Sequence, residues 1–168
     1  MTASASGPGS PRLGNFIGFA VCAALLGYAF YGQYALGLAP CPLCILQRIA
    51  VFAIGLAFVG AAVHRAGRGG AIAWGVIIGL VAAVGAAIAA RHVWITAQPP
   101  GTVAECGASL DYMLEVLPLR EVLAKVLTGS GECGKIDWRF LGLSMPAWVL
   151  AWMVALGTWG LFVNLRRR

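Results

Sequence analysis

The sequence contains few charged residues, and those it has are unevenly distributed. Only 11% of its 168 residues are Asp, Glu, Lys or Arg, whereas 60% are hydrophobic. A typical soluble domain is about 25% charged. No acidic residue occurs before Glu105, and all six lie between residues 105 and 137. This composition excludes an ordinary soluble domain and predicts a membrane protein.

Several cofactor and transport motifs are also missing. The C-x-x-C sequence at residues 41–44 is not followed by histidine, so there is no haem attachment motif. The chain has no glycine-rich dinucleotide motif between a strand and a helix, and no internal repeat. The sequence therefore gives no support to a haem protein, a nicotinamide-dependent enzyme or a transporter built from inverted repeats.

The hydrophobic residues form four segments long enough to cross a bilayer, at about residues 14–36, 44–63, 71–95 and 147–165. A hydrocarbon core of about 30 Å requires about 20 helical residues. We therefore expect an all-α membrane protein, with a four-helix transmembrane bundle in residues 14–168 after a flexible cytoplasmic tail, residues 1–13. Residues 98–145 form the one sizeable loop.

The arginines predict how the helices are oriented. Arg12, Arg65, Arg68 and the arginines at 166–168 all flank the spans on one side, and the acidic residues lie in the loop on the other. Because basic flanks stay in the cytoplasm, we expect both termini there and the C-x-x-C pair on the outer side. The net charge of +6 thus reflects topology, and nucleic acid is not an expected partner.

The long loop contains apolar residues at helical spacing. Leu110, Met113, Leu114 and Leu117 form one stripe, and a second follows Pro118. The stretch is too short and too polar to span a bilayer, so we expect a short amphipathic helix lying in the membrane interface. A small cap packed on the bundle is the alternative.

The sequence Pro-Cys-Pro-Leu-Cys-Ile-Leu-Gln-Arg, residues 40–48, opens the second span. Two intervening residues let Cys41 and Cys44 close a small disulfide ring, which would constrain the chain very little. A cysteine at a helix N-terminus near a cation has a stabilised thiolate, the reactive form. Arg48 lies one turn after Cys44 on the same helix face. The pattern favours a redox-active pair over an inert crosslink.

Four cysteines are expected on the outer side, where disulfides persist. Of the three pairings they allow, Cys41–Cys44 with Cys106–Cys133 is the most economical. A zinc site with four thiolate ligands is the alternative. It is weakened because Cys106 and Cys133 are separated by 26 residues and form no second C-x-x-C, so no metal is expected. Cys22, inside the first span, is expected to be a small buried apolar residue.

Two dithiols that exchange electrons need a further acceptor. Without a haem or nucleotide motif, a lipid-soluble quinone is the natural candidate. Arg48 can stabilise the Cys44 thiolate and a reduced quinone oxygen through its positive charge. An arginine inside a membrane helix is costly, which itself indicates a functional role. His92 lies at a similar depth on the third span and can bond a quinone carbonyl. The alternatives are a snorkelling Arg48 and an interfacial His92.

These motifs resemble the bacterial disulfide bond formation protein B (DsbB) family. The resemblance is carried by residues 40–48, by the loop cysteine Cys106, and by Gly131-Glu132-Cys133 with the block Trp-Arg-Phe-Leu-Gly-Leu-Ser-Met-Pro-Ala-Trp at 138–148. Together with four spans and cytoplasmic termini, it covers nearly the whole chain beyond the tail.

The resemblance implies an inner-membrane enzyme, a quinone-dependent oxidoreductase. Such an enzyme reoxidises a periplasmic thioredoxin-like dithiol oxidase (DsbA-like) and passes the electrons to ubiquinone or menaquinone. Carried over by motif, Cys106 would form the mixed disulfide with the partner, Cys133 would attack Cys41, and Cys44 would face the quinone with Arg48. The alternatives are a vitamin K epoxide reductase-like enzyme, in which the loop cysteines precede the C-x-x-C, and a non-enzymatic scaffold held by disulfides or zinc.

Overall fold

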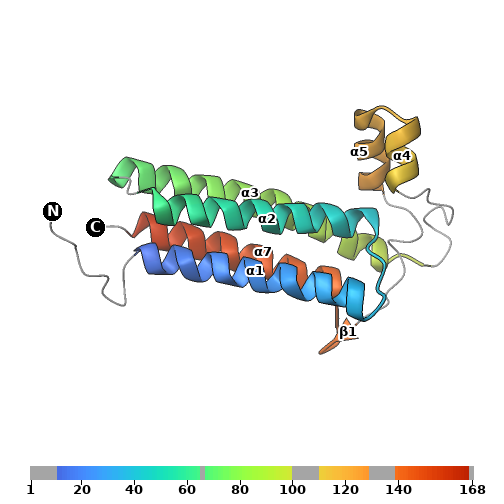
Figure 1. Cartoon of the computed structure of the whole chain (residues 1–168), viewed down its shortest axis with the longest axis horizontal. Helices are drawn as coiled ribbons and strands as arrows, with labels where there is room; N and C mark the ends of the chain where they lie inside the picture. The colour runs from blue at the N-terminus through green and yellow to red at the C-terminus, as the bar shows by residue number, and fades with distance from the viewer. Residues whose placement is uncertain (1–10, 65–66, 100–109, 129–138, 167–168) are drawn as a thin grey trace.

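Four long helices form the body of the molecule. The computed structural model describes residues 11–64, 67–99, 110–128 and 139–166. The long helices are α1 (Pro11–Ala35), α2 (Pro42–Val63), α3 (Arg68–Thr96) and α7 (Met145–Leu165), which lie alongside one another (Figure 1). Each is long and apolar enough to cross a membrane. The expected all-α fold with four transmembrane helices is confirmed.

The helices begin and end within three residues of the expected spans. Three of them start with proline in the first turn, at Pro11, Pro42 and Pro146. Proline suits this position because a first-turn N–H has no partner within the helix, and its φ angle is already helical. Helix α1 therefore begins inside the expected tail, and residues 1–10 lie outside the described part of the chain.

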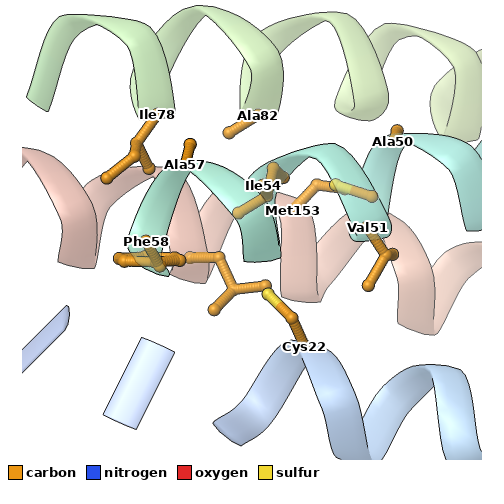
Figure 2. Close-up of a cluster of buried hydrophobic side chains, with 10 residues drawn as sticks. Cys22, Ala50, Val51, Ile54, Ala57, Phe58, Ile78, Ala82 and Met153 are labelled. Carbon is orange, nitrogen blue, oxygen red and sulfur yellow. The ribbon is translucent and has the colours of Figure 1, made fainter. Parts of the chain in front are cut away.

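The core lies where the four helices meet. Phe58, Ile54 and Ile78 are fully buried there, with Met153 from α7 (Figure 2). The cluster consists of Cys22, Ala50, Val51, Ile54, Ala57, Phe58, Ile78, Ala82, Met153 and Leu156. Cys22 is 1% exposed among these side chains, which confirms that it packs as a small apolar residue.

Two glycines let the helices approach closely. A Cβ atom at Gly18 on α1 would lie 2.6 Å from the ring of Phe58 on α2. A Cβ atom at Gly85 on α3 would lie 2.7 Å from the Sδ atom of Met153 on α7. Small residues at such contacts are typical of membrane helices, which associate through close packing.

A buried pair of amides joins α1 to α7 near the start of α1 and the end of α7. Asn15 and Asn164 exchange two hydrogen bonds, of 3.1 and 3.0 Å, and both side chains are buried. Trp159 adds a bond from its Nε1 to the Gly14 carbonyl, at 2.9 Å. Because unpaired polar groups are costly away from water, these bonds fix the register of the two helices.

Two short helices lie at the opposite end of the bundle (Figure 1). Helix α4 (Leu110–Val116) and helix α5 (Leu119–Thr128) are separated at Pro118, where the sequence predicted one amphipathic helix. Proline interrupts the helix because it lacks an N–H and restricts the residue before it. Their buried side chains join Cys41, Leu43 and Ile95 in a second apolar cluster, through Met113, Val122 and Val126. The placement of these helices in a membrane interface stays a prediction.

A two-stranded hairpin, which the sequence did not predict, precedes α7. Strand β1 (Arg139–Phe140) pairs antiparallel with β2 (Leu143–Ser144). Leu141 and Gly142 connect the strands with φ angles of 51° and 79°, both positive as in a type I′ turn. The Nε1 atom of Trp148 donates to the Phe140 carbonyl at 3.0 Å. The hairpin is therefore fastened to the first turn of α7.

Candidate active site

Cys41 and Cys44 lie where α2 begins. Cys41 is the N-cap residue, with extended backbone angles (φ −70°, ψ 162°), and its Sγ atom accepts the backbone N–H of Cys44 at 3.3 Å. The first N–H groups of a helix are not used within the helix and carry partial positive charge. This environment favours negative charge on the sulfur atoms.

The two sulfur atoms are close enough to bond after a small movement. The Cys41 and Cys44 Sγ atoms lie 2.9 Å apart, whereas a disulfide bond measures about 2.05 Å. Cys41 is buried and Cys44 is partly buried. The pair can therefore change between dithiol and disulfide without moving the helix.

His92 on α3 contacts this pair from the side. Its Nε2 atom lies 3.8 Å from the Cys41 Sγ atom, and its Nδ1 atom lies 2.9 Å from the Gln47 Nε2 atom. Both His92 and Gln47 are buried. The sequence placed His92 at a depth similar to that of Arg48, but it did not predict the contact with Cys41 or the role of Gln47. An amide within an apolar span was the available signal, because burying it requires a partner.

Arg48 is directed across the bundle toward α1. Its Nη2 atom donates to the Ala29 carbonyl at 3.0 Å, and its Nη1 atom donates to the Gln33 Oε1 atom. The guanidinium carbon lies 5.3 Å from the centre of the Phe30 ring. Arg48 is thus held in place by α1, and Gln33 is a second amide whose role the sequence did not predict.

A cavity of about 570 Å³ connects these groups. Small-molecule sites commonly measure about 300–1,000 Å³. Both cysteines, His92, Gln47 and Arg48 line it. Its remaining wall is mostly apolar and comes from all four long helices, the α1–α2 connection and the hairpin, through Leu25, Leu26, Tyr28, Ala29, Gly32, Gln33, Leu38, Ala39, Pro40, Val51, Thr96, Phe140, Ser144, Met145, Pro146, Trp148, Val149, Trp152, Met153 and Leu156.

The loop cysteines, Cys106 and Cys133, lie outside the described residues. Their pairing and their exchange with Cys41 stay predictions. The site as described therefore consists of the Cys41–Cys44 pair, His92, Arg48 and the two glutamines.

Comparison with known proteins identifies the family. The model of the family "Disulfide bond formation protein DsbB" matches residues 11–163. The chain belongs to the DsbB family. A disulfide bond formation protein B from Xanthomonas campestris pv. campestris is 49% identical over 153 residues, which cover 90% of this chain and 89% of that protein. The protein of the same name from Methylococcus capsulatus is 49% identical, and the match covers 90% of this chain and 93% of that protein. The one from Chromobacterium violaceum is 45% identical, and the match covers 94% of this chain and 95% of that protein.

DsbB membership makes the protein a multi-pass membrane oxidoreductase of disulfide bond formation. It confirms the resemblance carried by residues 40–48 and the block at 138–148. It also favours this family over the vitamin K epoxide reductase-like alternative and over a scaffold without enzymatic activity.

Proposed function

We propose that this protein is a thiol oxidase of the bacterial inner membrane that couples a periplasmic thioredoxin-like dithiol oxidase, of the DsbA kind, to membrane quinone. The observation that carries the proposal is the position of the Cys41–Cys44 pair. The two sulfur atoms lie 2.9 Å apart in the wall of a largely apolar cavity, beside Arg48 and His92. This arrangement brings a dithiol next to space suited to a lipid-soluble acceptor.

The proposed exchange passes through four cysteines. A partner thiolate attacks Cys106 of a Cys106–Cys133 disulfide, and the mixed disulfide forms as the Cys133 thiolate leaves. Cys133 then attacks Cys41, which breaks the Cys41–Cys44 bond and leaves a thiolate on Cys44. The second partner thiol resolves the mixed disulfide, so the partner is oxidised and Cys106 is released. The Cys106 thiolate then attacks Cys133 of the Cys133–Cys41 disulfide, which regenerates the loop disulfide and releases Cys41 as a thiol.

The cavity suits a quinone in size and in chemistry. Apolar and aromatic side chains, including Trp148 and Trp152, make up most of the wall, and polar donors occur at the cysteine end. Bound there, a quinone would accept the two electrons and two protons that the dithiol gives up. Arg48 would donate to its oxygen and stabilise the Cys44 thiolate, while His92 would hold or transfer the proton of Cys41, 3.8 Å away.

The direction of electron flow follows from redox potentials. DsbA is a strong oxidant, with a potential of about −120 mV, so few thiol–disulfide couples can reoxidise it. An acceptor of higher potential is needed, and a quinone dissolved in the membrane meets this requirement.

The same proposal sets the orientation. The cysteine end of the bundle would face the periplasm and both termini the cytoplasm, because the arginines flank the other end. Topology reporters fused after residues 68 and 130 are expected to report opposite sides of the membrane. If both report the same side, the orientation is wrong.

The function is tested with purified protein in detergent, a reduced thioredoxin-like partner and added quinone. We expect one quinone to be reduced for each partner disulfide formed. Cys44→Ser should abolish quinone reduction, and Cys106→Ser should block partner oxidation while the Cys41–Cys44 pair still reacts with quinone. Partner oxidation that consumes no quinone, or that persists in Cys106→Ser, would contradict the proposal.

A further inference from the structure

The Cys41–Cys44 pair and His92 offer more than a redox pair. The two Sγ atoms and one ring nitrogen of His92 lie within 4.8 Å of one another. We propose that these three residues form a binding site for a thiophilic divalent cation, represented by Zn²⁺, when the cysteines are reduced. The bound metal would hold the pair as dithiolate and so arrest its oxidation. This goes beyond the proposed function, which assigns no metal to the protein.

The distances suit tetrahedral zinc. With Zn–S bonds of about 2.3 Å and a Zn–N bond of about 2.05 Å, a tetrahedral centre separates sulfur from nitrogen by about 3.6 Å and the two sulfurs by about 3.8 Å. The Cys41 Sγ atom and His92 Nε2 atom are already 3.8 Å apart. The sulfur atoms, now 2.9 Å apart, must separate by roughly 0.9 Å, which rotation of the Cys44 side chain can supply.

Gln47 contacts the His92 ring nitrogen that does not face the cysteines. A histidine that binds a metal through Nε2 usually donates its Nδ1–H to a fixed acceptor, which sets the tautomer and the ring orientation. The Gln47 amide lies 2.9 Å from Nδ1 and is buried with His92. Turned so that its oxygen faces the ring, the amide accepts the Nδ1–H and leaves the Nε2 lone pair toward the sulfur atoms.

Charge and donor type select the metal. Two thiolates and a neutral imidazole carry a charge of −2, which a divalent cation cancels, so both thiolates can stay ionised in an apolar wall. Sulfur and imidazole donors favour zinc over magnesium or calcium, which take oxygen ligands. The cavity beside the pair leaves room for a water molecule as the fourth ligand.

Binding and oxidation are mutually exclusive. Zn²⁺ displaces two protons from the Cys41 and Cys44 thiols, whereas the disulfide has no thiolate to offer. Metal binding therefore stabilises only the dithiol, and no electron is transferred in the step. Zinc would inhibit the oxidase by making its inner dithiol harder to oxidise.

The test measures binding in the full chain without quinone, so its result does not depend on the proposed oxidase activity. A Cys106→Ser/Cys133→Ser background removes the loop thiols. Zn²⁺ is titrated against a chromophoric chelator, and proton release is measured in weak buffer. We expect one Zn²⁺ and about two protons per reduced protein, and no binding after oxidation of the pair.

Variants distinguish this site from zinc binding elsewhere in the chain. Gln47→Leu should weaken Zn²⁺ binding about 10–100-fold, as is typical when a metal-binding histidine loses its hydrogen-bond partner. His92→Ala, which removes the ligand itself, should weaken binding by at least as much. Thr96→Val is the matched control, because Thr96 lines the same cavity but donates to the Val93 carbonyl of its own helix, and it should leave binding unchanged. Circular dichroism and thermal unfolding show whether each variant is folded.

Three results would overturn the proposal. Binding lost in the Cys106→Ser/Cys133→Ser background would instead indicate the four-cysteine site. Unchanged affinity in a folded His92→Ala variant would show that the cysteines chelate the metal alone. Equal binding to oxidised and reduced protein would show that the metal lies elsewhere.

Discussion

Replacing Arg48 tests the proposed quinone site most directly. Two N–H groups of its guanidinium are held by the Ala29 carbonyl and the Gln33 side chain of α1, over the ring of Phe30. A guanidinium has five N–H donors, so donors remain for a ligand oxygen. Arg48 is thus fixed in the cavity wall before a quinone arrives, and little ordering would accompany binding.

The magnitude follows from the bond that is lost. A hydrogen bond to a charged group contributes about 1.5–3 kcal/mol, so Arg48→Ala should weaken apparent quinone affinity by roughly 10–150-fold. Arg48→Lys keeps the charge but loses the planar fork that spans both α1 acceptors, and it should fall in between. Gln33→Leu, which loosens the guanidinium without removing it, should weaken affinity only a few-fold.

The assay is turnover against quinone concentration for each variant. Single-turnover exchange with the reduced partner is the control, and it should stay near the wild-type rate. Because Arg48 also joins α2 to α1, thermal unfolding must show that each variant is folded. Unchanged quinone dependence in a folded Arg48→Ala variant would refute the reasoning, make Arg48 a structural link between helices, and leave His92 as the better quinone ligand.

Three further predictions concern other parts of the chain. Cys133→Ser should trap a mixed disulfide between Cys106 and the partner on a non-reducing gel, and trapping at another cysteine would reverse the roles of the two pairs. Asn15→Ala and Asn164→Ala should each lower stability by about 1–2 kcal/mol in detergent unfolding, and the double variant should lose less than the sum, whereas additive losses would deny their coupling. Leu141→Asn should raise the unfolding temperature slightly, because a non-glycine residue with positive φ is strained by about 1–2 kcal/mol and asparagine tolerates it; a lower temperature would show that the exposed leucine contributes contacts.

Hydropathy predicted the four-helix architecture because a bilayer imposes a simple rule. Spans of about 20 apolar residues must be helical, whereas the orientation expected from the arginines stays a prediction. The start of the second apolar segment at about residue 44 also indicated that Cys41 and Cys44 lie near a helix start. These features depend on local sequence, so they can be predicted from one sequence without knowing how the helices pack.

The polar contacts inside the bundle were not predictable in the same way. Gln33 and Gln47 lie on different helices, and their partners follow only from how α1, α2 and α3 pack. The hairpin was missed because Leu141 occupies a turn position where asparagine or glycine is usual. Three-dimensional proximity between distant segments, as between Cys41 and His92, has no signature in the spacing of residues.

The neutral groups around Arg48 have a consequence for the electric field in the cavity. The four long helices contain no aspartate or glutamate, and the oxygens of α1 that accept hydrogen bonds from this guanidinium are neutral. These neutral acceptors take two of its N–H groups but do not cancel its charge. Apolar walls screen this charge weakly, so its attraction extends across the cavity. Any species that gains negative charge there, whether sulfur or a reduced ligand oxygen, is stabilised before any atom moves.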